Sequence, residues 1–171
     1  MKKIFLIVIA SFLIILMTVL VHKIIDGIND KEVISDKISS LPHFIFNTLN
    51  GESFNSDEIL TGPLLLIRFH PECDHCKYEI EEITRLPGSD LKVLLISDAN
   101  TENVINFMKQ FDIRNKSNII PLIDSENKLN EIFGMGIIPS NFIYNSNLKL
   151  VKVLSGEHKT ETLLKYLNTH E

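Results

Sequence analysis

The chain has 171 residues, a formal net charge of −5, no Trp and two Cys. Its apolar content is ample and its charged fraction is ordinary, which excludes a wholly disordered chain. The length fits one domain, alone or with an appendage. The 17 Lys and Arg are scattered, whereas a nucleic-acid-binding protein would carry a basic patch, so we expect no nucleic-acid partner. Two Cys cannot close a four-thiolate zinc site, but they can form one dithiol–disulfide couple.

The N-terminus contains an uncharged stretch, Ile4 to Val21, behind Lys2 and Lys3. As a helix it would span about 27 Å, close to the roughly 30 Å hydrocarbon core of a bilayer. Neither a small-x-small cleavage site nor a Cys follows, so we predict a signal anchor over residues 1–21. A buried core helix and cleavage at a nonstandard site are the alternatives. Lys2 and Lys3 favour a cytoplasmic N-terminus, with the remaining chain on the periplasmic or cell-surface side.

Residues 22–41 are polar with isolated aliphatic side chains, and we interpret them as a linker or stalk. Residues 42–171 alternate between strand and helix patterns, which predicts an α/β fold with a central sheet, helices on both faces and antiparallel later strands. Pro121 lacks a backbone donor, so its strand is expected at a sheet edge, unless the residue starts the strand. The predicted strands are 44–46 with 54, 64–69, 92–96, 119–123, 141–144 and 148–154; the predicted helices cover 78–86, 101–111, 126–133 and 160–167.

The motif Cys73-Asp74-His75-Cys76 follows the apolar strand 64–69 and begins a helical pattern. Two Cys three positions apart on the first turn of a helix can form a disulfide with little backbone movement. The first Cys lies beside the positive end of the helix dipole, where a thiolate is favoured. We therefore predict a redox couple in which Cys73 is the exposed nucleophile and Cys76 is the resolving thiol.

Two other interpretations of the motif remain open. The cysteines could bind a metal together with His70 and His75, although His75 lies inside the short loop, where its reach is poor. They could also form an inert structural disulfide, but so small a loop removes little chain entropy. We favour redox chemistry, with no metal and no cofactor besides the Cys73–Cys76 disulfide.

From Pro42 to about Leu167 the chain resembles the thioredoxin-like superfamily, in particular the membrane-anchored TlpA-like thiol–disulfide oxidoreductases with a redoxin domain. The segment LPHFIFNTLNGESF looks like the opening hairpin of that group, and LLLIRFHPECDHC looks like its strand ending in the active-site CxxC. Ile138-Pro139 occupies the place of the cis-proline of the family, preceded by a residue whose backbone contacts the substrate. The resemblance implies a thioredoxin-like fold, a protein disulfide as substrate, Ile138 and Pro139 as substrate-binding residues, and a transmembrane thiol reductase as electron donor.

The sequence also departs from the family pattern. Glu72 stands where many of these proteins have Trp, and the strand before the motif is apolar up to Arg68, without the buried acid of thioredoxin. Asp74 could substitute for that acid, whereas Glu79, Glu81 and Glu82 are expected on a solvated helix face. Peroxiredoxins have Thr or Ser at the position of His70, which disfavours the alternative of a peroxidase; a copper-binding chaperone with this fold is a further alternative.

Three side chains are expected to modulate the couple. A protonated His75 would make it more oxidising, as in the periplasmic dithiol oxidases that carry a His before the second Cys. Glu72 and Asp74 add negative charge beside Cys73 and disfavour its thiolate. Because both acids are ionised at pH 7 while histidine is mostly neutral, we predict a moderately reducing couple.

Overall fold

The computed structural model describes residues 12–23, 33–85, 91–111, 113 and 116–168. The chain divides into two compact units, Met1–Asp36 and Lys37–Glu171. In the first unit residues 12–23 are helical. No helix among the described residues combines the length and the apolar character that a membrane crossing requires. Residues 1–11 of the predicted anchor lie outside the described residues.

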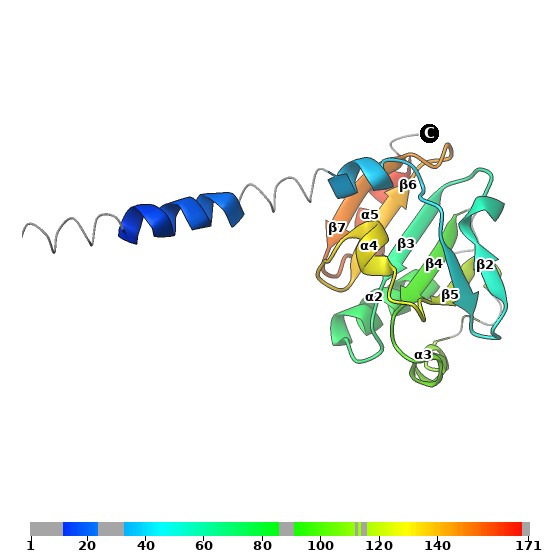
Figure 1. The fold of residues 1–171 in the computed structure, drawn as a ribbon. Helices are drawn as coiled ribbons and strands as arrows, with labels where there is room; N and C mark the ends of the chain where they lie inside the picture. Colours follow the sequence, from blue (N-terminus) through cyan, green and yellow to red (C-terminus); the bar gives the residue numbers. More distant parts are fainter. Residues whose placement is uncertain (1–11, 24–32, 86–90, 112, 114–115, 169–171) are drawn as a thin grey trace, which may run out of the picture. The chain divides into compact units, whose positions relative to one another are not determined.

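The second unit is built on a seven-stranded mixed sheet with strand order β2-β1-β5-β4-β3-β6-β7 (Figure 1). The central strands β3, β4 and β5 are parallel, and β6 and β7 continue the sheet in antiparallel pairings. This confirms the expected α/β sheet with antiparallel later strands. The strands are β1 (Ile45–Thr48), β2 (Ser53–Asn55), β3 (Leu64–Arg68), β4 (Lys92–Ser97), β5 (Ile119–Ile123), β6 (Ser140–Tyr144) and β7 (Leu150–Ser155).

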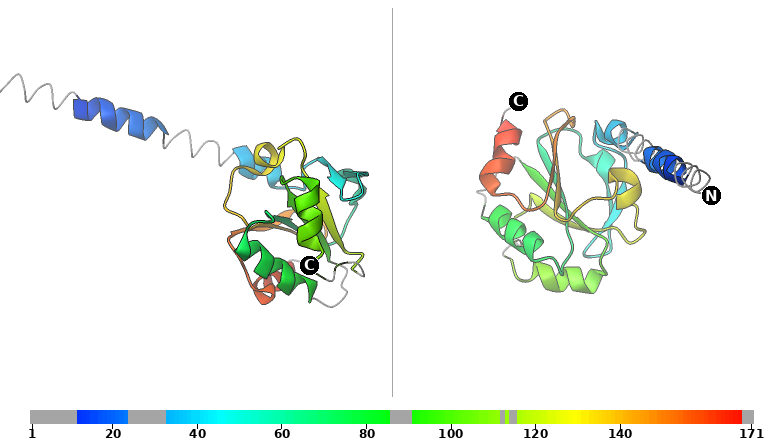
Figure 2. Two further views of the ribbon diagram at one scale, coloured as in Figure 1. Left: turned by 90° about the horizontal axis from the view of Figure 1, so that it is seen from below. Right: turned by 90° about the vertical axis from the view of Figure 1, so that its left-hand side faces the viewer.

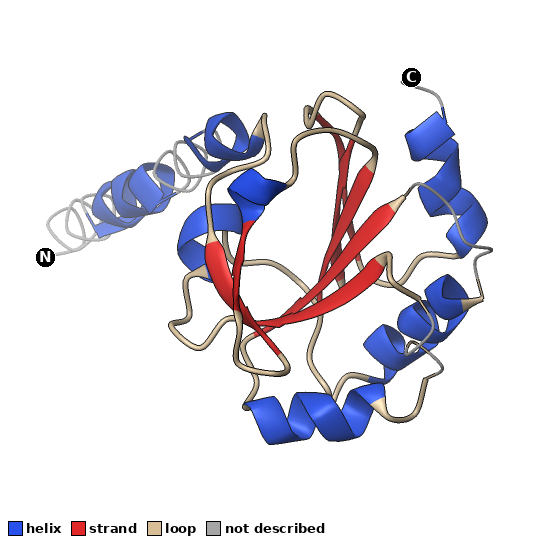
Figure 3. Ribbon diagram, turned by 90° about the vertical axis from the view of Figure 1, so that its right-hand side faces the viewer, coloured by secondary structure: helices blue, strands red, loops and turns tan. Residues whose placement is uncertain are grey.

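The helices cover both faces of the sheet unequally (Figures 2 and 3). The connections from β3 to β4 and from β4 to β5 step in the same direction across the sheet, so right-handed crossovers place α2 and α3 on one face. Helix α5 packs beside α2 on that face, and the short α4 lies on the other face. The helices are α2 (Asp74–Thr84), α3 (Thr101–Met108), α4 (Leu129–Phe133) and α5 (Thr160–Asn168), with a 3-10 turn η1 (Ser56–Glu58) after β2.

Each face of β3 contributes to a separate apolar layer. Phe69, the residue after the strand, stacks on Phe107 of α3 with ring centroids 5.4 Å apart. On the opposite face Phe133 of α4 packs against Phe44 and Phe142. Because both layers bury β3 completely, the end of this strand, from which the CxxC segment begins, is fixed in place.

Three local expectations need correction. Strand β5 is not at an edge, since it lies between β4 and β1. Strand β1 pairs with β5 only at Leu122 and Ile123, so Pro121 has no partner residue in β1. Helix α3 ends at Met108, because the following residues close tighter turns, with the Phe111 amide donating to the Met108 carbonyl. Helix α4 starts at Leu129 because the Asp124 carboxylate accepts hydrogen bonds from the amides at its start.

Candidate functional site

Cys73 is the N-cap residue of α2, so it precedes the first helical turn instead of lying within it. A turn leads to it from β3, and the Cys73 amide donates to the His70 carbonyl at 3.0 Å. Its Sγ accepts a hydrogen bond from the Cys76 amide at 3.2 Å. The Cys73 side chain is partly exposed. A sulfur in this position can react with a disulfide from solvent while the helix N-terminus stabilises negative charge on it.

Cys76 lies one turn further along α2 and is fully buried. Both cysteines are free thiols in the structure. Burial raises the pKa of the Cys76 thiol, and its hydrogen bond with Cys73 acts in the same direction. The pair is therefore asymmetric, with one accessible sulfur and one protected sulfur.

Ile138 and Pro139 lie beside the accessible sulfur. Their peptide bond is cis, and the Ile138 carbonyl oxygen is 3.9 Å from Cys73 Sγ. The preceding residues Met135 and Ile137 are 89% and 69% exposed. The structure thus brings together Cys73, Cys76, Ile138 and Pro139, four of the residues proposed from sequence.

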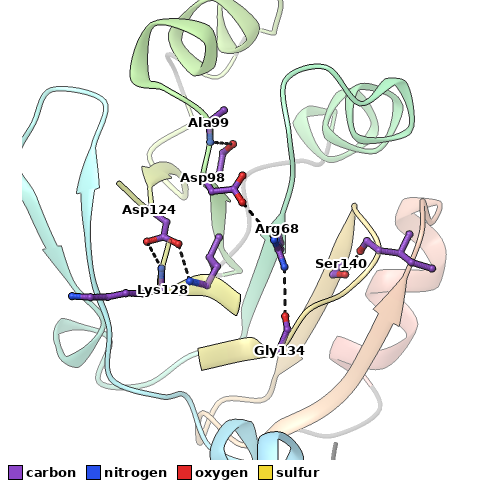
Figure 4. A network of polar contacts seen from close by, with 10 residues as sticks. Arg68, Asp98, Ala99, Asp124, Lys128, Gly134 and Ser140 are labelled. Carbon is purple, nitrogen blue, oxygen red and sulfur yellow. Dashed lines mark hydrogen bonds and ion pairs between the residues drawn. The ribbon is translucent and has the colours of Figure 1, made fainter. Parts of the chain in front are cut away.

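Polar contacts hold the loop 134–139 at both ends (Figure 4). At its start the buried guanidinium of Arg68 lies 3.5 Å from the Gly134 carbonyl oxygen and 3.5 Å from the Asp98 carboxylate. Near its end the Ser140 hydroxyl donates to the Ile137 carbonyl. Arg68 ends β3 and Ser140 begins β6, directly opposite each other in the sheet. The sheet therefore fixes the position of this loop relative to the CxxC segment.

The three predicted modulating residues are all exposed. The Glu72 amide donates to His70 Nδ1. Asp74 is the first residue of α2. His75 is paired with a residue far along the chain: its Nδ1 lies 2.7 Å from Glu157 Oε2. Asp74 is thus an exposed acid next to Cys73, and its effect on the couple stays a prediction.

The buried acid of the site is Glu79, and the prediction that it lies on a solvated helix face is wrong. Its side chain has no exposed surface. Oε1 accepts hydrogen bonds from Asn141 Nδ2 at 3.0 Å and from the His158 amide at 2.9 Å. Burial raises the pKa of Glu79 to about 7, against the lowering effect of both hydrogen bonds. Its position, three residues after Cys76 and four before Ile83, is on the buried face of the helix and was a usable signal.

Glu79 and Cys76 interact electrostatically. They lie one helical turn apart on α2, and the negative charge of Glu79 contributes to the raised pKa of Cys76. Glu79 Oε2 is buried and has no hydrogen-bond partner within the described residues. This oxygen is therefore available to carry a proton, and the carboxyl group can exchange one near neutral pH.

The described residues contain no cluster of three or more His, Cys, Asp or Glu that could hold a metal ion. The two proposed nitrogen donors make other contacts, His75 with Glu157 and His70 with the Glu72 amide.

Two sequence relatives share most of their length with this chain. "Thiol-disulfide oxidoreductase ResA" of Bacillus subtilis (strain 168) is 21% identical over 143 residues, which cover 81% of this chain and 77% of the relative. The protein of the same name from Bacillus cereus is 24% identical over 132 residues, covering 74% of this chain and 73% of the relative. No family model matches the chain.

The fold has counterparts among solved structures. MTB dsbF, determined in its mixed oxidized and reduced forms, superposes with a TM-score of 0.65 at 16% identity, covering 78% of this chain and 96% of that one. This similarity confirms the predicted thioredoxin-like fold. The names of the two sequence relatives confirm the predicted enzyme class.

Proposed function

We propose that this chain, a thiol–disulfide oxidoreductase with a thioredoxin-like fold, is tethered to a membrane and reduces disulfides of other proteins outside the cytoplasm. The main support for this reaction is the unequal exposure of the two cysteines. Cys73 is partly exposed at the start of a helix, and Cys76 is buried behind it. This arrangement suits an attacking thiol followed by a resolving thiol.

The reaction has two exchange steps. The Cys73 thiolate attacks one sulfur of the substrate disulfide, the substrate S–S bond breaks, and its other sulfur leaves as a thiolate that takes up a proton. Cys76 then loses its proton and attacks Cys73 Sγ, which releases the second substrate thiol and leaves the Cys73–Cys76 disulfide. Two electrons pass to the substrate, and a thiol reductase in the membrane supplies two more, which reduce the Cys73–Cys76 disulfide again.

The second step needs a proton acceptor because the Cys76 thiol has a raised pKa. Glu79 is suited to this role, since it lies one turn away, has a pKa of about 7 and keeps one buried oxygen free of hydrogen bonds within the described residues. We assign it as the general base of the resolving step.

A protein substrate is supported by the surface next to Cys73. The exposed apolar side chains of Met135 and Ile137 flank the Ile138 carbonyl, which faces the sulfur. An extended peptide could form a backbone hydrogen bond with residue 138 while its apolar side chains cover the two exposed ones. The acidic groups around the motif support a reducing couple, because negative charge disfavours the thiolate of the reduced form.

The reaction is tested by the reduction potential of the full chain in detergent micelles, equilibrated with glutathione and dithiothreitol buffers. We expect a value near that of thioredoxin, roughly −270 mV. A value near −120 mV, roughly that of a strong dithiol oxidant, would reverse the proposed direction. A couple that does not equilibrate with either buffer would contradict thiol–disulfide exchange altogether.

Anchoring rests on the apolar stretch Ile4–Val21 behind two lysines and is tested separately. In cells that express the full chain, the protein should stay with the membrane after alkaline carbonate extraction. Protease added outside the cytoplasmic membrane should digest the C-terminal domain. Release by carbonate, or protection from that protease, would contradict the proposed topology.

A further inference from the structure

Three consecutive residues after β7 contact three different parts of the active site. The Gly156 amide donates to the Pro139 carbonyl at 2.8 Å. The Glu157 carboxylate lies 2.7 Å from His75 Nδ1. The His158 amide donates to Glu79 Oε1 at 2.9 Å. No role was predicted for this segment from the sequence.

We propose that Glu157 is a positioning residue whose carboxylate holds the His75 imidazole and cancels its charge, which keeps the Cys73–Cys76 couple reducing. The proposal rests on the proposed thiol–disulfide exchange and adds a determinant of its potential that lies outside the CxxC motif. Glu157 needs no contact with the substrate for this role.

The direction of the effect follows from the charge of the pair. Whatever the protonation of the imidazole, His75 and Glu157 together carry a charge between −1 and 0. With a neutral side chain at residue 157, the same site would carry a charge between 0 and +1. The disulfide form of the couple is uncharged, whereas the reduced form becomes negative when a thiol ionises. A neutral or negative pair therefore gives the reduced form less support than a free imidazolium would.

The contacts on both sides explain why this pair keeps its geometry. Ion pairs between exposed side chains are worth little, because two mobile groups must be ordered to form them. His75 and Glu157 are both exposed, with 73% and 42% of their side-chain surface accessible. The backbone of Glu157, however, is held by the hydrogen bonds of Gly156 and His158, so less conformational entropy is lost when the ion pair forms.

The same carboxylate acts on the buried acid of the site. The negative charge of Glu157 contributes to the raised pKa of Glu79, after the larger effect of burial. Glu157 thus lies near enough to influence both the exposed imidazole and the buried carboxyl group.

The test compares reduction potentials of the full chain carrying Glu157→Gln, Glu157→Asp or Glu161→Gln, each equilibrated with glutathione at pH 7. Glu157→Gln should shift the equilibrium roughly three- to tenfold toward the dithiol form, which corresponds to a potential about 14 to 30 mV more oxidising. Glu157→Asp keeps the charge and should stay close to the unmodified chain. Glu161→Gln removes an exposed carboxylate from the first turn of α5 and should leave the equilibrium unchanged.

Two results would overturn the inference: no shift in Glu157→Gln, or an equal shift in Glu161→Gln. A merely structural role for Glu157 would lower the thermal unfolding midpoint without moving the potential. Failure of the proposed function is a separate outcome, because the unmodified chain would then not equilibrate with glutathione.

Discussion

The His158 amide donates a 2.9 Å hydrogen bond to Glu79 Oε1 and thereby connects the segment after β7 to the buried face of α2. Asn141 of β6 donates to the same oxygen and is itself fully buried. Two donors on one oxygen hold the carboxyl group in place, while burial disfavours its charged form. Glu79 is therefore fixed in position and able to change protonation close to neutral pH.

Glu79→Gln should change how stability depends on pH. The folded chain keeps the Glu79 proton up to about pH 7, whereas an ordinary glutamate loses it near 4.5. Between these values the unfolded chain binds fewer protons, so the free energy of unfolding falls as the pH rises. The Glu79→Gln variant lacks this loss, because its amide does not titrate. From pH 4 to pH 8 the free energy of unfolding of the variant, relative to that of the unmodified chain, should rise by up to about 3 kcal/mol.

Urea unfolding followed by far-ultraviolet circular dichroism measures this difference, since the chain has no Trp. Glu81→Gln is the matched control, because Glu81 is an exposed carboxylate on the same helix, paired with Arg85. If the two variants show the same pH profile, Glu79 does not titrate as described.

Glu79→Gln should also slow the resolving step. Without the carboxylate, the proton of the buried Cys76 thiol has no acceptor one turn away, and loss of a general base costs about 10²-fold or more in rate. The mixed disulfide between Cys73 and disulfide-bonded insulin should accumulate during turnover, as quenched-flow samples on non-reducing gels would reveal. Unchanged resolution at pH 7 would remove Glu79 from the mechanism, while the reaction of Cys73 itself should keep its rate.

Cys76→Ser should trap the intermediate completely. Cys73 is the partly exposed sulfur, so the variant should still attack a disulfide of intact insulin but cannot release the bound chain, and multiple turnover should be abolished. Mass spectrometry should find one substrate chain attached to Cys73. Cys73→Ser should form no adduct, since Cys76 is buried. An adduct on Cys76 would show that the roles of the two sulfurs are reversed.

Most of the correct predictions came from short-range sequence patterns. The apolar strand before Cys73, the helical rhythm after it and the hairpin before α5 follow from short-range patterns, and the structure has all three. The opening turn has a local cause as well, since an Asn-Gly dipeptide favours positive φ and Gly51 adopts it.

The residues that the sequence did not reveal act across long separations. Glu157 meets His75 over 82 residues, and Asn141 meets Glu79 over 62. Glu79 was grouped with Glu81 and Glu82, which are paired with Arg85 on the helix surface. Its spacing from Cys76 was the local signal that set it apart. Pro121 suggested an edge strand, but partial pairing by β1 accommodates it inside the sheet. The long-range contacts and the place of β5 depend on which strands and loops become neighbours, and a single sequence does not encode that in any local pattern.

Substitutions of Arg68 and Asp98 should lower the stability of the fold by unequal amounts. The Arg68 guanidinium is mostly buried, with 11% of its side-chain surface exposed, while Asp98 keeps 27%. Among the described residues, Asp98→Ala would leave this cation with only the long contact to the Gly134 carbonyl, and we expect a loss of about 1–3 kcal/mol in the free energy of unfolding. Arg68→Met removes the charge, keeps apolar volume against the sheet and leaves Asp98 able to reach water, so its effect should stay within about 1 kcal/mol.

Urea unfolding of both single variants and of the double variant at pH 7 tests this prediction. Because the cost in Asp98→Ala arises from an uncompensated guanidinium, adding Arg68→Met should restore most of the lost stability. A double variant less stable than Asp98→Ala alone would mean that Arg68 stabilises the fold through packing or through its bond to the loop 134–139. In that case the two substitutions in the double variant should also lower the rate of exchange with a protein disulfide, since this loop carries Ile138 beside Cys73.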